Sequence, residues 1–229
     1  MEEIVNLEKS LSALDRIYDL YQKYTTTLKL VCKKGCASCC TRNVTMTTLE
    51  GYQIVCFLES QKRDDVLPKV AAASTQDRFL PQITTNALAD LYMSHKEAPE
   101  EAFTAMEEKC IFLEGNVCTI YPVRPFACRC LISERNCTET GYASVGSFTV
   151  TISTLLLQYI EQADANGGFS NLVDILMVLM QTEGRRAYEQ SRLELSRLLK
   201  NRPIPLLLVP PEHQQQVSPI LTELQRIVS

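Results

Sequence analysis

The sequence lacks the features that mark several common protein classes. It contains no run of about 18 apolar residues, the length that crosses a bilayer. It has no glycine loop that could cradle a phosphate and no HExxH helix of a zinc hydrolase. Its only two histidines are His95 and His213, and neither is near a cysteine in sequence. A Cys-His catalytic pair therefore has no support, and a metal site would have to be built from sulfur.

Charge and the first residues exclude further classes. The formal net charge is -4, from 23 basic and 27 acidic residues without a basic run, which argues against a nucleic-acid binder. The opening residues, MEEIVNLEKS, lack the basic-then-apolar order of a secretory signal, so we expect a cytoplasmic protein and no membrane partner. In that reducing compartment, ten cysteines are expected to be metal ligands or catalytic thiols rather than stable disulfides.

The apolar periodicity predicts a mainly α fold. A helix is expected over 3–29, and a capping box of Thr47 and Glu50 predicts another over 48–60. The segment 61–108 is expected to be helical in pieces. Later helices are predicted over 151–164, 171–182 after a Ser170 cap, 184–200 and 218–228, with an extended proline-rich strap, NRPIPLLLVPP, before the last.

The length of 229 residues suits one domain, 1–229. In it, 32–60 and 110–130 are expected to form a cysteine-cluster core and 148–229 a helical C-terminal part. One small β-hairpin is predicted after Cys110, because β-branched and aromatic residues flank a Gly-Asn turn. A three-residue loop, Glu114 to Asn116, would place Cys110 and Cys118 on one face. The hairpin is expected to pack on the first cysteine segment.

The cysteines form two groups that are far apart in sequence. A structural zinc or an iron–sulfur cluster takes about four thiolates, commonly from two such groups. On a helical turn, Cys36, Cys39 and Cys40 would share one face. Cys56 is expected to be an ordinary core residue, and Cys137 to be unpaired. The first group is Cys32, Cys36, Cys39 and Cys40, and the second is Cys110, Cys118 and Cys128, followed by Cys130.

The motifs CKKGCASCC, VTMTTLEGYQIV and CIFLEGNVCTIYPVRPFACR together resemble the YkgJ-type cysteine-cluster family, whose pattern is CxxxCxxCC followed by C-x-F-L, C-x-I-Y and R-P-x-x-C-R. The family is described as a zinc- or iron-chelating domain. The resemblance implies that seven thiols bind metal, and it leaves open whether Cys130 is a ligand and whether there is one site or two. These thiols belong to Cys32, Cys36, Cys39, Cys40, Cys110, Cys118 and Cys128.

Ligand softness does not separate zinc from an iron–sulfur cluster. We favour the cluster because the CxxxCxxC spacing can wrap a cubane, and zinc is the alternative. Arg124 and Arg129 are predicted to bind the cofactor by offsetting the excess thiolate charge, and the competing interpretation is an ion pair with an acid such as Glu134.

We therefore expect a metal-binding protein with a structural role or a role in redox or metal sensing. An enzyme with an open cluster is the alternative, acting in electron transfer or protein modification. Some larger proteins with a similar cluster are lysine N-methylases acting on flagellin. Whether this chain is an enzyme stays open, as does a protein partner docked on the strap. The partner that the cysteines predict is a metal ion or cluster.

Overall fold

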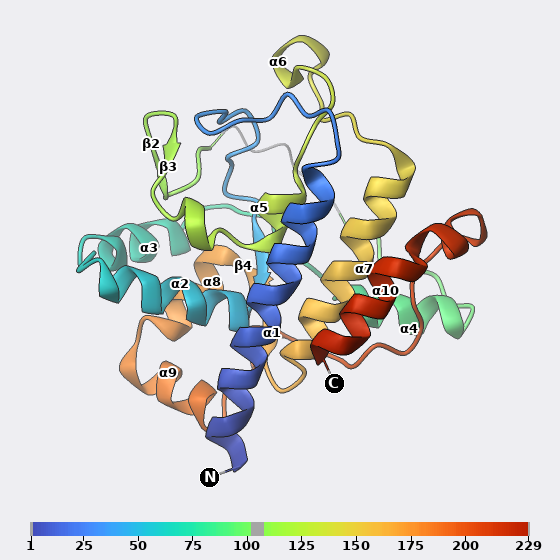
Figure 1. Ribbon diagram of the computed structural model, residues 1–229. Coiled ribbons are helices and arrows are strands. Elements are labelled where there is room, and N and C mark those ends of the chain that lie inside the picture. Colours follow the sequence, from blue (N-terminus) through green and yellow to red (C-terminus); the bar gives the residue numbers. More distant parts are fainter. Residues whose placement is uncertain (1, 102–107, 229) are drawn as a thin grey trace.

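The computed structural model describes residues 2–101 and 108–228, and its fold is mainly α, as predicted (Figure 1). Residues 102–107, part of the segment expected to be helical in pieces, lie outside the described residues. Helix α1 (Glu2–Thr25) runs between two groups of helices. The first group is α7 (Ser147–Ala163) and α10 (Gln214–Val228), and the second is α2 (Thr48–Ser60), α3 (Val66–Ser74), α8 (Leu172–Leu179) and α9 (Thr182–Glu189).

Shorter elements complete the fold. α4 (Thr85–Met93) packs on α7, and two 3-10 turns, η1 (Tyr121–Val123) and η2 (Pro211–His213), precede α5 and α10. α5 (Phe126–Cys130) and α6 (Cys137–Thr140) follow the hairpin of β2 (Leu113–Glu114) and β3 (Val117–Cys118). None of the helices between residues 2 and 228 that the structure describes is both long and apolar enough to span a bilayer.

The capping box is confirmed, and α2 has the predicted bounds. The Glu50 N–H donates to Thr47 Oγ1 at 3.3 Å, and the Thr47 N–H donates to Glu50 Oε2 at 2.8 Å. The first helix ends at Thr25, four residues earlier than expected. The hydroxyls of Thr25, Thr26 and Thr27 each donate to a carbonyl three residues back, which competes with continuation of the helix.

Several predicted bounds in the C-terminal part are wrong. The helix predicted over 184–200 ends at Glu189, and the chain passes through a positive φ of 51° at Ser191 before forming β5 (Leu199–Lys200). α8 is capped by Asn171, whose side chain accepts from the Val173 N–H at 3.0 Å, and Ser170 belongs to a strand. α7 and α10 each begin four residues earlier than predicted.

A three-stranded antiparallel sheet, in the order β1-β4-β5, was missed in the sequence. It pairs β1 (Thr45–Thr47) with β4 (Gly168–Asn171), and β4 with β5. The strands are two to four residues long, which is too short to show the alternation of apolar and polar residues that predicts a strand. The sheet ties the end of the first cysteine segment to the region between α7 and α8, and so fixes where that segment enters the core.

Two apolar clusters fill the interior. One joins α1, α7 and α10, and the other joins α2, α3 and α8. Helices α2 and α8 approach closely at Gly51, where a Cβ atom would lie 2.3 Å from Cγ2 of Ile175. The proline-rich strap lies on α7, where Gln158 donates to the Leu206 carbonyl and accepts from the Leu208 N–H, both at 2.8 Å.

Asp164, at the C-terminal end of α7, connects the two halves of the core. Its side chain is 5% exposed and accepts from the Thr48 hydroxyl at 2.6 Å, the Leu49 N–H at 2.9 Å, the Tyr188 hydroxyl at 2.7 Å and the Asn201 amide at 3.0 Å. Burial is the main cause that raises the pKa of this carboxyl to about 7. The folded protein therefore keeps a proton on Asp164 at pH values where the unfolded chain has released it.

We expect the free energy of unfolding to fall as pH rises from about 4 to about 7, by about 1.4 kcal/mol per pH unit from Asp164 alone. The sign follows because the folded pKa is raised, so the native state binds the additional proton in this window. The Asp164→Asn variant should lack this component of the slope. Urea unfolding of both proteins at several pH values measures it, since all other groups contribute equally to both. Identical slopes would contradict the assignment.

Candidate metal centre

Seven of the ten cysteines line one cavity of about 220 Å³. The cavity lies at the end of the molecule where the segment between α1 and β1 meets the hairpin and α5 (Figure 1). The seven are those that the sequence resemblance implies as ligands: Cys32, Cys36, Cys39, Cys40, Cys110, Cys118 and Cys128. The structure brings them together from three separate segments, and their role as ligands stays a prediction.

The first cysteine segment is a pair of hydrogen-bonded turns, not a helical turn. The Cys36 N–H donates to the Lys33 carbonyl at 2.9 Å, and the Cys40 N–H donates to the Ala37 carbonyl at 3.1 Å. Gly35 has a φ of 90°, which favours glycine and breaks any helical path. The expectation that Cys36, Cys39 and Cys40 share a helical face is therefore wrong.

Backbone hydrogen bonds join the two cysteine segments. The Cys110 N–H donates to the Cys40 carbonyl at 3.1 Å, and the Arg42 N–H donates to the Glu108 carbonyl at 3.2 Å. Between them, Thr41 and Lys109 form an antiparallel bridge. Segments about 70 residues apart in sequence are thus held in register at the wall of the cavity.

The hairpin has a two-residue loop, so the predicted three-residue loop is wrong. Leu113 pairs with Cys118 and Glu114 with Val117, which leaves Gly115 and Asn116 as the loop, with Gly115 at a φ of 61°. Both cysteines still line the cavity. Strand alternation does not apply to Cys110, because its carbonyl accepts from the Leu113 N–H at 3.0 Å in a turn before the strand.

The short helix α5 directs two cysteines to different places. Cys128 lines the cavity, whereas Cys130 packs in the apolar cluster of α1 and α7 and donates to the Ala127 carbonyl at 3.4 Å. Burial raises the pKa of Cys130 to about 12. Cys130 thus lies among apolar side chains and outside the cavity, although it is close enough to Cys128 to raise the pKa of that thiol.

A buried carboxylate, Glu50, holds α5 in place. Its Oε1 accepts from the Tyr18 hydroxyl at 2.8 Å and from the Phe126 N–H at 2.7 Å, while Oε2 accepts from the Thr47 N–H and hydroxyl. Glu50 is 2% exposed. One side chain therefore caps α5, satisfies α2 and links both to α1. The capping box predicts that Glu50 caps the start of α2. The hydrogen bond from the Phe126 N–H to the Glu50 side chain has no local signal in the sequence, because the two residues are 76 positions apart.

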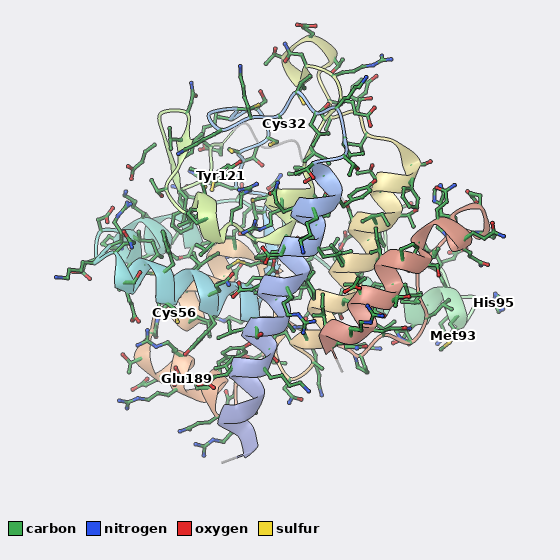
Figure 2. All side chains as sticks on the ribbon, in the orientation of Figure 1. Cys32, Cys56, Met93, His95, Tyr121 and Glu189 are labelled. Atoms are coloured by element: carbon green, nitrogen blue, oxygen red, sulfur yellow. The ribbon has the colours of Figure 1, made fainter. Side chains whose placement is uncertain are left out.

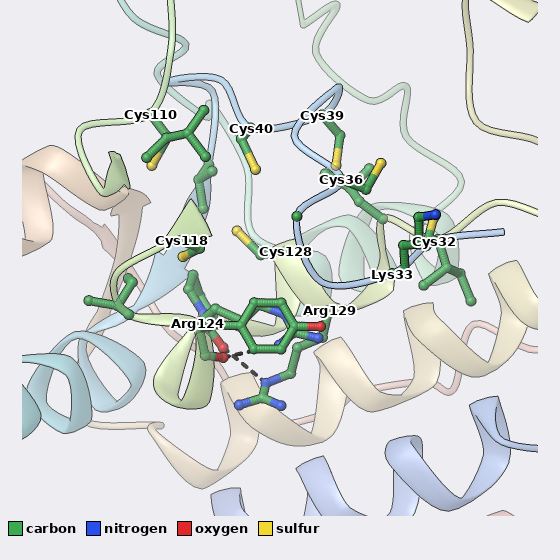
Figure 3. A pocket seen from close by; sticks show the side chains of 18 of the residues that line it. Cys32, Lys33, Cys36, Cys39, Cys40, Cys110, Cys118, Arg124, Cys128 and Arg129 are labelled. Atoms are coloured by element: carbon green, nitrogen blue, oxygen red, sulfur yellow. Dashed lines mark hydrogen bonds between the residues drawn. The ribbon is translucent and has the colours of Figure 1, made fainter. Parts of the chain in front are cut away.

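Four of the thiols are in mutual electrostatic contact. Cys40 interacts with Cys110, Cys118 and Cys128; Cys128 interacts with Cys110 and Cys118; and Cys110 interacts with Cys118. We call these four the inner thiol group. In Figure 3 they lie on one side of the cavity, with Cys36 and Cys32 on the other.

The inner thiol group has the electrostatics of a cation site. Burial, followed by the neighbouring thiolates, raises the pKa of Cys128 well above its usual range, and burial raises that of Cys110 to about 11. A hydrogen bond from the Cys39 thiol, the largest effect, lowers the pKa of Cys40. Soft sulfur donors that repel one another as thiolates are stabilised together by a positive ion or cluster. The donor set therefore fits a thiophilic metal group.

The thiols of the cavity are not arranged as the ligands of a single metal ion. Within residues 2–101 and 108–228, no three Cys, His, Asp or Glu side chains are close enough together to hold a metal ion as they stand. The inner thiols are thus near enough to interact electrostatically and too far apart to share one ion without moving.

The two arginines named from the sequence have different surroundings. Arg124 lies with its guanidinium carbon 3.7 Å from the Tyr121 ring centroid, and its charge lowers the pKa of Cys118, which burial raises overall. Arg129 donates from Nε to the Arg124 carbonyl at 2.9 Å and from Nη2 to the Pro122 carbonyl at 2.7 Å. Its guanidinium carbon lies 3.9 Å from the centroid of the Tyr18 ring. Arg129 thus stabilises the turn before α5 through its hydrogen bonds to the Pro122 and Arg124 carbonyls, while the Arg124 charge acts on the Cys118 sulfur.

Other residues lie away from the cavity. Cys56 is exposed on α2, so its predicted place in the core is wrong: it falls on the side of the helix that the apolar clusters leave uncovered (Figure 2). His95 is exposed, and His213 is buried against Thr151, with 2.8 Å between its Nδ1 and the Thr151 hydroxyl. Neither histidine lines the cavity, which fits an all-sulfur donor set.

Replacing Glu50 tests whether it supports the site. In Glu50→Gln, the amide NH2 would face either the Phe126 N–H or the Thr47 N–H, both of which can only donate, so we expect the free energy of unfolding to fall by about 3 kcal/mol. Tyr18→Phe removes a single hydrogen bond and should lower it by about 1 kcal/mol. Urea unfolding of both variants measures the difference. Wild-type stability in Glu50→Gln would refute the role.

Comparison with known proteins identifies the cysteine segments. No curated protein and no solved structure matches the chain. A family model, CxxCxxCC, described as "Putative zinc- or iron-chelating domain", matches residues 31–144, a range that contains all ten cysteines. The family name denotes two residues between its first cysteines, whereas this chain has Lys33, Lys34 and Gly35 there. Through residues 31–144 this chain belongs to the CxxCxxCC family, which confirms the resemblance to a cysteine-cluster, metal-chelating domain.

Proposed function

We propose that the protein binds an iron–sulfur cluster through the inner thiol group, Cys40, Cys110, Cys118 and Cys128. The observation that carries the proposal is that these four thiols, which come from three separate segments of the chain, line one cavity. Four thiolates are the usual ligand set of such clusters. When bound, the cluster would supply a cross-link between the two cysteine segments and a one-electron redox centre.

The size of the cavity supports a cluster over a single zinc ion. A zinc ion gathers its four sulfurs at about 2.3 Å from one centre, whereas a cluster places its irons, and therefore its cysteine ligands, further apart. The cavity of about 220 Å³ has room for a group larger than one ion. Zinc is the alternative metal that family membership allows.

The remaining residues of the cavity would tune the cluster. Four thiolates give the site excess negative charge, which the Arg124 guanidinium beside Cys118 offsets. Val44, Ile120 and Leu172 line the same cavity and limit access of water. Arg129 acts indirectly, because its hydrogen bonds to the Pro122 and Arg124 carbonyls hold the turn that precedes α5.

Cys128 and Cys130 provide a matched pair for the central test. Both are on α5, but only Cys128 lines the cavity. After anaerobic purification, Cys128→Ser should lose most of the iron, the acid-labile sulfide and the visible absorption, whereas Cys130→Ser should keep them. Iron and sulfide analysis with a visible spectrum measures this. A colourless wild-type protein with stoichiometric zinc would sink the iron–sulfur proposal, and equal loss in both variants would sink the ligand assignment.

The two arginines should give separable effects. Arg124→Ala removes a positive charge near the sulfurs and should lower the reduction potential of the cluster, while Arg124→Lys keeps the charge and restores most of it. Arg129→Ala breaks the brace on the turn and should weaken metal retention. Redox titration and iron retention against a chelator measure the two effects. An unchanged potential in Arg124→Ala and unchanged metal content in Arg129→Ala would count against these roles.

An enzyme with an open cluster is the second candidate function. The observation in its favour is that the cavity extends beyond the thiols along α1, where Tyr18, Tyr21, Gln22 and Thr25 line it. A substrate bound there would contact the cluster directly, as electron transfer or modification of a protein side chain such as lysine N-methylation would require. Cyanide added to the reduced protein distinguishes the candidates, because it alters the electron paramagnetic resonance spectrum only if an iron lacks a cysteine ligand.

A further inference from the structure

We propose that the face around the mouth of the cysteine cavity docks an acidic electron-carrier protein. We call this face the basic rim and define it by four exposed lysines, Lys23, Lys29, Lys33 and Lys34. The inference rests on the proposed function, because an electron carrier needs a redox centre close beneath the face on which it docks. It goes beyond that function by naming the kind of partner and the side chains that would bind it.

The charge of the chain is divided unevenly. Residues 20–49 hold five basic side chains and no acidic one, so this segment has a formal charge of +5. The whole chain has 23 basic and 27 acidic residues, which leaves 18 basic and 27 acidic side chains elsewhere, a formal charge of -9. A protein with an overall negative charge thus has one strongly positive segment, and this segment contains the first cysteine group.

The cavity opens to solvent through the same segment. Of the exposed residues that line the cavity, all but Asn116 and Leu131 belong to residues 22–39. Lys33 is one of them, and Figure 3 shows it beside Cys32. In Figure 1, the segment after α1 crosses the end of the molecule next to the hairpin and α6. A partner that covers the mouth of the cavity would therefore contact the basic rim.

The lysines of the basic rim have no acidic partner within the chain. None of the ion pairs found among residues 2–101 and 108–228 includes them. Two acids of the second cysteine segment are already paired, Glu108 with Arg42 at 2.9 Å and Glu114 with Arg63 at 3.0 Å. The positive charge of the rim is therefore open to carboxylates of another protein.

Exposed apolar side chains lie beside the lysines. Val31, Val117 and Leu131 are 47%, 48% and 44% exposed. Leu131 lines the cavity, Val117 follows the lining residue Asn116, and the Val31 N–H donates to the Ser133 carbonyl at 3.0 Å. Apolar contacts surrounded by charge are typical of protein interfaces, whereas nucleic acids bind mainly through phosphates, which need only the charge. The mixture therefore favours a protein partner.

The position of the redox centre selects the kind of protein. Cys36 and Cys39 line the cavity and are exposed, so a partner seated on the basic rim would lie directly over the thiol-lined wall. Complexes of electron-transfer proteins bury little surface and depend on complementary charge. One electron would pass from the reduced carrier to the centre in the cavity; the carrier is oxidised and no bond is made or broken. A basic rim fits an acidic one-electron carrier.

Reversal of two charges tests the basic rim. Lys29→Glu with Lys34→Glu changes two exposed lysines that do not line the cavity, so its iron content and visible spectrum should equal those of the wild-type protein. The probe is a purified acidic ferredoxin. We expect it to associate about tenfold more slowly with the double variant than with the wild-type protein. This difference should shrink as salt rises from about 0.1 M to about 1 M. Biolayer interferometry measures the association rate.

Lys96→Glu is the matched control. It makes the same change of charge at an exposed lysine after α4, beside His95, which Figure 2 shows well separated from Cys32. It should associate with the ferredoxin at the wild-type rate, and a basic cytochrome c should bind none of the proteins. Equal slowing in Lys96→Glu, or a wild-type protein that does not bind the ferredoxin, would overturn the docking surface and leave the proposed function intact.

A redox measurement separates docking from electron transfer. Under anaerobic conditions, reduced ferredoxin should bleach the visible absorption of the wild-type protein, and should do so more slowly in the double variant. Binding without bleaching would overturn the electron-carrier role, as would tighter binding of duplex DNA or anionic phospholipid vesicles through the same lysines. A colourless zinc protein would overturn the proposed function together with electron transfer, and metal analysis detects this independently of binding.

Discussion

The carboxylate of Glu50 is the contact on which the arrangement of the site depends. It accepts hydrogen bonds from Tyr18 on α1, from Thr47 at the start of α2 and from the backbone of Phe126 at the start of α5. A buried carboxylate needs such donors, and these donors lose their partner if it is removed. The hydrogen bonds of this one carboxylate therefore hold α1, α2 and α5 in fixed positions relative to one another. In this position, α5 places Cys128 in the cavity and Cys130 in the apolar cluster of α1 and α7.

Around that anchor, the cysteine segments are held mainly by backbone hydrogen bonds. Cys40 and Cys110 are joined directly, and Val31 is joined to Ser133. Side chains on such a frame can turn without unfolding it, which is what a protein needs if thiols are to close on a metal after folding.

Much of the fold follows from local patterns. The capping box predicted α2 to the residue, and the cysteine motifs predicted which thiols would line one cavity. The misses have local causes as well. Hydrogen bonds from three threonine hydroxyls to the backbone end α1 early. The hairpin has a two-residue loop, and Cys110 still lines the cavity because it lies in a turn before the strand, where strand alternation does not apply. The β1-β4-β5 sheet was missed because its strands are too short to show a period, and because β1 pairs with β4 across more than 100 residues.

The sequence by itself indicated the type of metal ligand. It has ten cysteines, most of them in the pattern of a chelating family, and only two histidines, both far from any cysteine, so sulfur is the expected donor atom. Only the tertiary structure decided how those donors are divided. Cys56 is exposed, Cys130 packs partly buried against the apolar cluster of α1 and α7, and Cys137 lies outside the cavity that the other seven cysteines line. The reason is that spacing limits which residues share a short segment, whereas proximity between segments depends on buried contacts such as those of Glu50 and Ser133.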